Sequence, residues 1–189
     1  MKRAEALKIL DELKNSPNMI KHGLAMGFAM AELYDFFKKG GRSPEMKKDD
    51  WEIAGILHDA DYEITNKSLD LHTEKTTKKL KEIKADQLII DAIRGHCDKA
   101  PRNTLLAKAV YAADELTGLI VAAALVQPDK KLKSVTAESV MRKFKDKSFA
   151  AGANRDQIRT CETELKISLE EFIGLILSAM QNHAEELGL

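Results

Sequence analysis

The sequence predicts an all-α protein, a single-domain bundle of about eight helices. Apolar residues recur at spacings of three and four along nearly the whole chain, and no convincing stretch alternates as a half-buried strand would. Glycine and proline are sparse, at 10 and 4 of 189 residues, while hydrophobic residues make up 44%. This composition is typical of a helix-rich protein, and the length is sufficient for one well-buried core.

Turn-forming residues interrupt the helical pattern and indicate the helix boundaries. The first helix ends at N-S-P-N, residues 15–18, because proline cannot continue a helix, and the second ends at Gly40-Gly41. Asp49 or Asp50 is expected to cap the third helix. The predicted helices cover residues 2–14, 19–39, 48–59, 69–82, 85–97, 104–125, 134–144, 155–166 and 168–187.

Charge and hydropathy limit the partners. Thirty basic and thirty acidic residues give a net charge of zero, so no general field attracts nucleic acid polymers or an anionic membrane. No apolar stretch reaches the roughly 18 residues of a membrane span, and the N-terminus does not resemble a signal peptide. With only Cys97 and Cys161, a reducing compartment fits, and we expect a cytoplasmic protein. The amphipathic segment 168–181 could serve the core or a homodimer interface.

Histidine and aspartate residues form the most informative pattern in the chain. A single histidine on an apolar helix is more often an ordinary core or surface residue, but several here lie within apolar helical segments. Asp114 is surrounded by apolar residues in the predicted helix 104–125, and a buried carboxylate without a partner is costly, so a cation is expected beside it. The full series is His22, His58, Asp59, His72, His96 and Asp114.

The ordered set His22, His58-Asp59 and Asp114 resembles the HD-domain superfamily over about residues 18–125. Many members of that superfamily are metal-dependent phosphohydrolases. The resemblance implies a helical bundle in which helices of about 134–187 pack on the metal-binding core. It also implies that these four residues bind a first metal ion.

His72 and His96 extend the resemblance to members with a binuclear site. In those members the aspartate of the HD pair bridges two ions, and two further histidines bind the second. We therefore expect one or two divalent transition-metal ions. Imidazole and carboxylate ligands suit Mn, Fe, Ni, Co or Zn.

The resemblance implies hydrolysis of a small phosphoester, with nucleotides among the candidates, by attack of a metal-activated water. Asp59 belongs to the expected catalytic centre, and Asp61 or Glu63 could accept a proton or orient the water, although both could equally cap a loop. Several cations are candidates for binding the anionic substrate, although in a chain this rich in lysine a solvated surface charge is the more common role for each. They are Lys75 and Lys79 beyond His72, Lys99 and Arg102 after His96, and Arg155 before a later helix.

Two alternatives remain open at this stage. Some HD-domain proteins with the same six-ligand series hold two irons and use dioxygen to cleave carbon bonds, and ligand identity alone does not separate them from hydrolases. A signalling module could also keep the fold and bind metal or nucleotide without turnover. Metal analysis and oxygen consumption would distinguish the oxygenase from the hydrolase.

Overall fold

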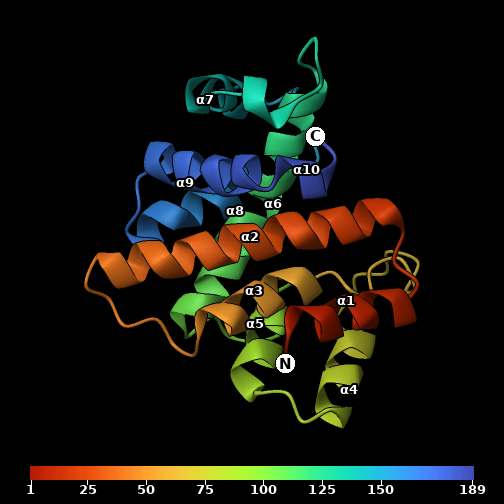
Figure 1. Cartoon of the computed structure of the whole chain (residues 1–189). Helices are drawn as coiled ribbons and strands as arrows, with labels where there is room; N and C mark the ends of the chain where they lie inside the picture. The colour runs from red at the N-terminus through yellow and green to blue at the C-terminus, as the bar shows by residue number, and fades with distance from the viewer.

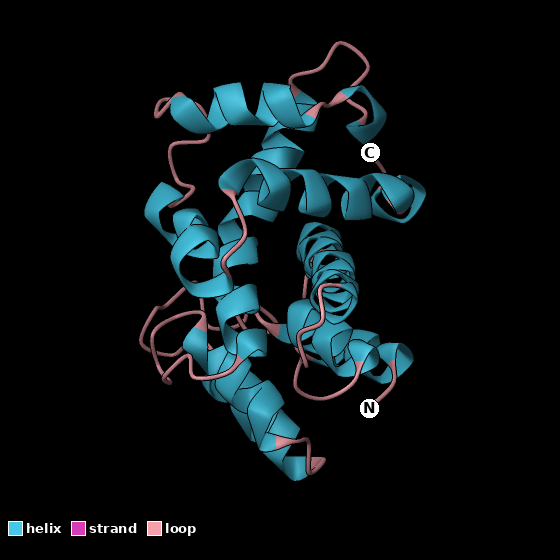
Figure 2. Ribbon diagram, turned by 90° about the vertical axis from the view of Figure 1, so that its left-hand side faces the viewer, coloured by secondary structure: helices cyan, strands magenta, loops and turns pink.

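The structure is a computed structural model that describes residues 1–189. It consists of helices joined by loops, without a strand (Figure 2), which confirms the predicted all-α fold. The α-helices are α1 (Arg3–Glu12), α2 (Pro17–Lys39), α3 (Lys48–Leu57), α4 (Glu74–Glu82), α5 (Gln87–Gly95), α6 (Leu105–Leu125), α7 (Ala137–Lys145), α8 (Arg155–Thr160), α9 (Leu169–Asn182) and α10 (Ala184–Leu187). A 3-10 turn, η1 (Leu132–Ser134), precedes α7, and a π-helical turn, η2 (Cys161–Leu165), follows α8.

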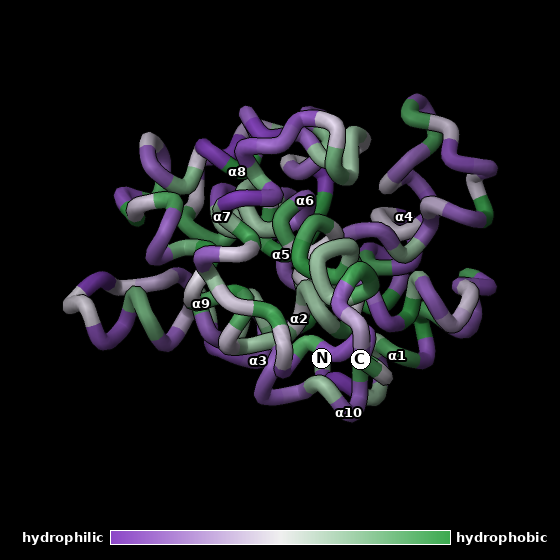
Figure 3. The backbone as a smooth tube through the Cα atoms, turned by 90° about the horizontal axis from the view of Figure 1, so that it is seen from above, coloured by the Kyte–Doolittle hydropathy of each residue, from purple (hydrophilic) through white to green (hydrophobic).

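The long helix α6 runs through the middle of the bundle and is crossed by α2 (Figure 1). Helix α6 contacts α2, α5, α8 and α9, while α2 also packs on α3 and α9. Forty-nine buried hydrophobic residues form one core that extends from Ala6 in α1 to Leu187 in α10. Hydrophobic segments accordingly gather in the centre of the view from above, with mostly hydrophilic segments around them (Figure 3).

The predicted helix 155–166 consists of α8 followed by the π-helical turn η2, and four further details differ from the sequence-based boundaries. Lys47, rather than Asp49 or Asp50, is the N-cap of α3, and its backbone N–H donates to the Asp50 carboxylate over 3.2 Å. The predicted helix 134–144 starts later, because Thr136 caps α7 with its hydroxyl. The predicted helix 168–187 is divided into α9 and α10 at His183. The fourth detail concerns His72 and is the most relevant for function.

His72 was expected inside a helix of residues 69–82, but it lies in the turn before α4. Thr73 follows it with φ +67°, a left-handed conformation that is unusual for a β-branched residue. The N–H of Thr73 donates to the Asp61 carboxylate over 2.8 Å, and this bond holds the backbone in place. The tertiary contact to Asp61 thus overrides the helical pattern of the local sequence.

Close packing of α2 on α3 depends on glycines from both helices. A Cβ on Gly23 would lie 2.6 Å from the carbonyl oxygen of Ile56, and one on Gly55 would lie 2.6 Å from that of Met26. Neither distance can accommodate a side chain. The two glycines therefore let the backbones of α2 and α3 approach each other. Gly23 is adjacent to His22 in sequence, and Gly55 precedes His58 by three residues.

None of the helices combines the length and the hydrophobicity required to cross a lipid bilayer.

Candidate metal centre

Helix ends and turns carry four of the six predicted ligands, and only two ligands lie within helices. His22 is on α2 and Asp114 is on α6. His58 caps the C-terminus of α3, with Asp59 next to it, and His96 caps α5. Residues at the ends of α3 and α5 can aim their side chains into the interior while the chain turns away.

Four of these side chains form a first group around the Nε2 atom of His58. This atom lies 3.1 Å from His22 Nε2, 3.2 Å from Asp114 Oδ1 and 3.7 Å from Asp59 Oδ2. His22 Nε2 is in turn 3.4 Å from Asp114 Oδ1 and 3.6 Å from Asp59 Oδ2. Two ligand atoms that each lie about 2.1 Å from one metal ion, with roughly 90–110° between the two metal–ligand bonds, are about 3.0–3.4 Å apart. The spacing of this group fits a shared metal ion.

A second group lies on the other oxygen of the same Asp59 carboxylate. Asp59 Oδ1 is 3.0 Å from His72 Nε2 and 3.2 Å from His96 Nε2, and the two ring nitrogens are 2.9 Å apart. The Sγ atom of Cys97 also lies within 4.8 Å of the ligand atoms of both histidines. Asp59 therefore stands between two groups and faces each with a different oxygen.

Hydrogen bonds fix the orientation of three of the histidine rings. The Nδ1 of His58 donates to the Gly55 carbonyl over 2.8 Å, and that of His96 donates to the Ile93 carbonyl. The Nδ1 of His72 donates to the Asp61 carboxylate over 3.0 Å. In a neutral imidazole the other nitrogen, Nε2, then carries a lone pair. The Nε2 lone pairs and the carboxylate oxygens thus face one another and would repel unless protons or metal ions lie among them. These ligand atoms therefore fit metal binding.

The pKa values of the metal-free cluster reflect the same need for positive charge among the ligand atoms. Burial alone would lower the pKa of His22, but its hydrogen bonds with Asp114 and Asp59 outweigh burial and raise the pKa to about 10. For His72, bonds with Asp59 and Asp61 likewise outweigh burial and raise the pKa to about 9. Burial would raise the pKa of Asp59, yet the surrounding histidines hold it well below its usual value. The metal-free cluster therefore favours bound protons, which supply the positive charge that a metal ion would also supply.

Asp61 is fully buried and accepts three hydrogen bonds. Besides His72 Nδ1, its carboxylate accepts from the backbone N–H groups of Thr73, over 2.8 Å, and Thr76, over 3.0 Å. Burial would raise its pKa, but these bonds keep the pKa below the usual value. The carboxylate therefore holds the His72 ring and the start of α4 in place.

The other acidic and basic candidates also have defined contacts. Glu63 accepts a hydrogen bond from the backbone N–H of Ser16 over 2.6 Å and so anchors the start of α2. Lys75 donates to the Ile64 carbonyl over 3.2 Å. Lys79 forms an ion pair with Glu12 of α1. These contacts join segments that lie next to one another in the fold, two of them between residues far apart in sequence.

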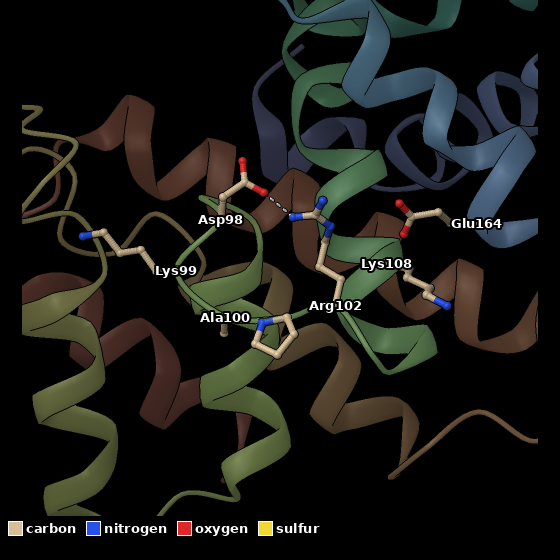
Figure 4. Close-up of a pocket in the computed structure, with 7 residues that line it drawn as sticks. Asp98, Lys99, Ala100, Arg102, Lys108 and Glu164 are labelled. Carbon is tan, nitrogen blue, oxygen red and sulfur yellow. Dashed lines mark hydrogen bonds and ion pairs between the residues drawn. The ribbon is translucent and has the colours of Figure 1, made fainter.

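Lys99 and Arg102 line a surface hollow of about 670 Å³ beyond His96 (Figure 4). Arg102 pairs with Asp98, and its guanidinium lies 3.7 Å from the centre of the Tyr111 ring. Lys99 points away from Arg102 in Figure 4, and its amine is 2.6 Å from the Asp70 and His72 carbonyls. The two cations therefore do not converge on one point.

Arg155 is engaged with the loop that precedes α8. Its guanidinium donates to the carbonyl oxygens of Ala150 over 2.6 Å and Ala153 over 2.7 Å. It also bonds to those of Phe144, Asp146 and Phe149. Its role as a substrate contact stays a prediction, and its contacts are those of a loop anchor.

One side of the centre is more accessible than the other. The side chains of His58, His72 and His96 are 0–4% exposed, whereas those of His22, Asp59 and Asp114 are 24%, 19% and 17% exposed. A small molecule can thus approach from the side of α2 and α6. Lys21 and Gly118, which line a cavity there with His22, were not expected from sequence, although Lys21 adjoins His22 and Gly118 lies one turn from Asp114.

The family model of the HD domain matches residues 19–119. The chain belongs to the HD-domain family. The matched segment begins before His22 and ends after Asp114, so it includes all six clustered residues of this HD-domain protein. Comparisons with curated proteins and with solved structures gave no match. Family membership places the chain in a superfamily of metal-dependent hydrolases and indicates divalent metal binding.

Proposed function

We propose that the protein is a phosphohydrolase that cleaves a small phosphoester at a centre of two divalent transition-metal ions. His22, His58 and Asp114 would hold one ion, His72 and His96 would hold the other, and Asp59 would bridge the two. Such ions lower the pKa of a water ligand, orient a phosphate oxygen and offset charge as the phosphoester is attacked.

The observation that carries this proposal is the division of the Asp59 carboxylate between two groups. Oδ2 is 3.6 Å from His22 Nε2, and Oδ1 is 3.0 Å from His72 Nε2. A carboxylate that meets only one group would support a single ion. The ligand set also contributes two negative charges against four positive charges of two divalent ions, so the loaded centre would attract a phosphate dianion in a chain of zero net charge.

The chain's own residues orient and shield this centre. The Gly55 and Ile93 carbonyls and the Asp61 carboxylate keep three imidazole rings turned inward. Such partners are known to set ligand orientation and affinity. Because Asp61 already accepts three N–H bonds in a buried site, we assign it a positioning role rather than a role as proton acceptor. The buried histidines shield one side, so substrate enters beside His22.

The test is a screen of the Mn²⁺-loaded protein against phosphomonoesters, nucleotides and cyclic nucleotides. The readout is release of phosphate or, for the cyclic nucleotides, formation of the nucleoside monophosphate. We expect hydrolysis that falls at least 100-fold in Asp59→Ala, because both ions lose a ligand. His183→Ala is the matched control, since this histidine lies outside the cluster, stacks on Phe28 and bonds to Glu186.

Two results would contradict the proposal. Hydrolysis that persists undiminished in Asp59→Ala would place the reaction elsewhere. Protein that is isolated anaerobically with two irons, consumes oxygen with a polyol or an organophosphonate and cleaves no phosphoester would instead be an oxygenase.

A further inference from the structure

A cavity of about 490 Å³ begins at His22 and extends between α2, α6 and the C-terminal residues. Besides His22, its walls include Ala25 of α2, Gly118 and Val121 of α6, and Leu187 and Leu189 at the end of the chain. We call it the α2–α6 cavity. Its volume is within the range of small-molecule sites, roughly 300–1,000 Å³.

The α2–α6 cavity meets the metal centre at His22, the one clustered residue that lines it. His22 is the most exposed of the six clustered side chains, and its Nε2 lies 3.4 Å from Asp114 Oδ1. On α6, Gly118 follows Asp114 by four residues and Val121 follows by seven, so all three lie on one helix face. A molecule whose phosphate reaches the centre from this side would place its remaining atoms in the cavity.

The walls of the cavity are mostly apolar. Ala25, Val121, Leu125, Leu187 and Leu189 present hydrocarbon, and Leu125 is 50% exposed, which is high for a leucine. The polar side chains on the walls are those of Asn18, Lys21 and His22. The base and sugar of a nucleoside carry more hydrogen-bonding groups than these few polar side chains can pair, and groups left unpaired against the apolar part of the walls are unfavourable. An aryl or alkyl group has no such penalty.

Gly118 keeps the cavity open beside Asp114. It lies within the long helix α6, where glycine is less favourable than alanine by roughly 1 kcal/mol. A Cβ placed on it would meet no atom within 4 Å, so helix packing does not require a glycine here. The missing side chain instead leaves open space at this wall of the cavity.

Lys21 supplies a positive charge at the same end of α2. It lines the cavity, and its amine lies beside Gly188 of the C-terminal segment, 2.6 Å from where a Cβ on that glycine would be. An ammonium at this wall of the cavity would attract an anionic group of a bound molecule.

We propose that the α2–α6 cavity binds the organic group of a phosphomonoester of an aryl or alkyl alcohol, with its phosphate at the metal centre. The inference rests on the proposed phosphohydrolase function and names its substrate class. Hydrolysis breaks the bond between phosphorus and the alcohol oxygen and forms a bond between phosphorus and the oxygen of water. One proton of that water passes to the alcohol oxygen, and inorganic phosphate leaves with the other.

The test is equilibrium binding of two phosphonates, which lack the scissile P–O bond, to the Mn²⁺-loaded full chain by calorimetry. We expect phenylphosphonate to bind on the order of ten- to a hundredfold more tightly than methylphosphonate, because the cavity removes the phenyl ring from water. Gly118→Leu should abolish this preference while leaving methylphosphonate affinity and metal content unchanged. Gly174→Leu is the matched control, since a Cβ on Gly174 of α9 would also meet no atom within 4 Å, but this glycine does not line the cavity.

Several results would overturn the inference. Equal affinity for the two phosphonates in the wild-type protein, together with phosphoester hydrolysis, would remove the cavity as a subsite and leave the proposed function intact. Failure of both phosphonates to bind, without hydrolysis, would overturn both proposals. A preference that survives in Gly118→Leu would place the organic group elsewhere. Should Gly118→Leu fail to fold, Val121→Phe narrows the same cavity, and a retained preference in that variant would also overturn the inference.

Discussion

The Nε2 atoms of His72 and His96 lie 2.9 Å apart, and neither ring is free to turn away. Each ring is held by its Nδ1, which donates to Asp61 in one case and to the Ile93 carbonyl in the other. Two acceptors at this distance repel each other unless a cation lies with them. The fold therefore uses hydrogen bonds at Nδ1 to direct the lone pairs of both rings toward a shared cation.

Metal binding should release protons near neutral pH. In the metal-free protein the pKa of His22 is raised to about 10 and that of His72 to about 9, so both rings are protonated at pH 7 and must lose that proton to become ligands. The metal affinity should thus fall as the pH is lowered. Calorimetric titration with Mn²⁺ in two buffers of different ionisation enthalpy measures the release, and heats that do not depend on the buffer would contradict it.

The same shifts predict how pH changes the stability of the metal-free protein. A histidine whose pKa is raised on folding stabilises the folded state below its ordinary pKa of 6.5, and this contribution disappears as the pH rises through about 9 to 10. The free energy of unfolding should therefore decrease from pH 6.5 to pH 10. Urea unfolding of the wild-type protein and of His22→Ala across this range tests the prediction. If His22→Ala shows the same pH dependence as the wild type, the raised pKa of His22 does not contribute to stability.

Asp61→Asn should weaken the second metal group selectively. Asparagine has one acceptor oxygen in place of two, so at least one of the three N–H donors at this position loses its partner. Removal of such an orienting partner typically lowers metal affinity about 10- to 100-fold. Metal titration should show one ion bound as in wild type and the other weakened. Glu63→Gln is the control, because glutamine can still accept the hydrogen bond from the Ser16 N–H. An equal loss of metal affinity in Glu63→Gln would refute a specific role for Asp61.

Gly55→Ala should disturb the contact between α2 and α3. The added Cβ would lie 2.6 Å from the Met26 carbonyl oxygen, so the helices must separate. Overpacking of this kind destabilises by about 1–3 kcal/mol. The separation also moves His22 away from His58, and we expect weaker binding of the first ion.

Gly174→Ala provides the comparison for this substitution, since its Cβ would meet nothing within 4 Å. It should stabilise α9 by about 0.5–1 kcal/mol. Urea unfolding of the two variants measures the contrast, and equal stabilities would show that α2 and α3 do not need the close approach.

Arg155→Ala should lower stability without changing phosphate binding. The guanidinium bonds to backbone carbonyls of the segment between α7 and α8, and loss of a hydrogen bond from a charged group removes about 1.5–3 kcal/mol. Arg142→Ala is the control, because Arg142 is an exposed residue that contacts Glu138. A large rise in KM for a phosphoester in Arg155→Ala, with unchanged stability, would instead support the substrate contact that the sequence suggested.

The ligand series could be predicted from sequence because it depends on residue type and order. Asp114 within an apolar helix and the His58-Asp59 pair at a helix end are visible in the sequence alone. The role of Asp61 was not, because its bonds to Thr73 and Thr76 arise from a turn that overrides the helical pattern around His72. The pairing of Lys79 with Glu12 joins segments far apart in the chain and likewise leaves no local signal.

The cavity beside the centre was also beyond sequence reasoning. Its walls come from α2, α6 and the C-terminal residues, and nothing in the sequence shows that Leu189 approaches His22. Gly118 illustrates the point, since a glycine in a helix is informative only once the space around it is known.

The most direct test of the central claim is anomalous diffraction from a crystal of the Mn²⁺-loaded protein. The account predicts two anomalous peaks, one beside each oxygen of the Asp59 carboxylate, with His22, His58 and Asp114 around the first and His72 and His96 around the second. A fully loaded crystal with no peak among these six side chains would contradict it.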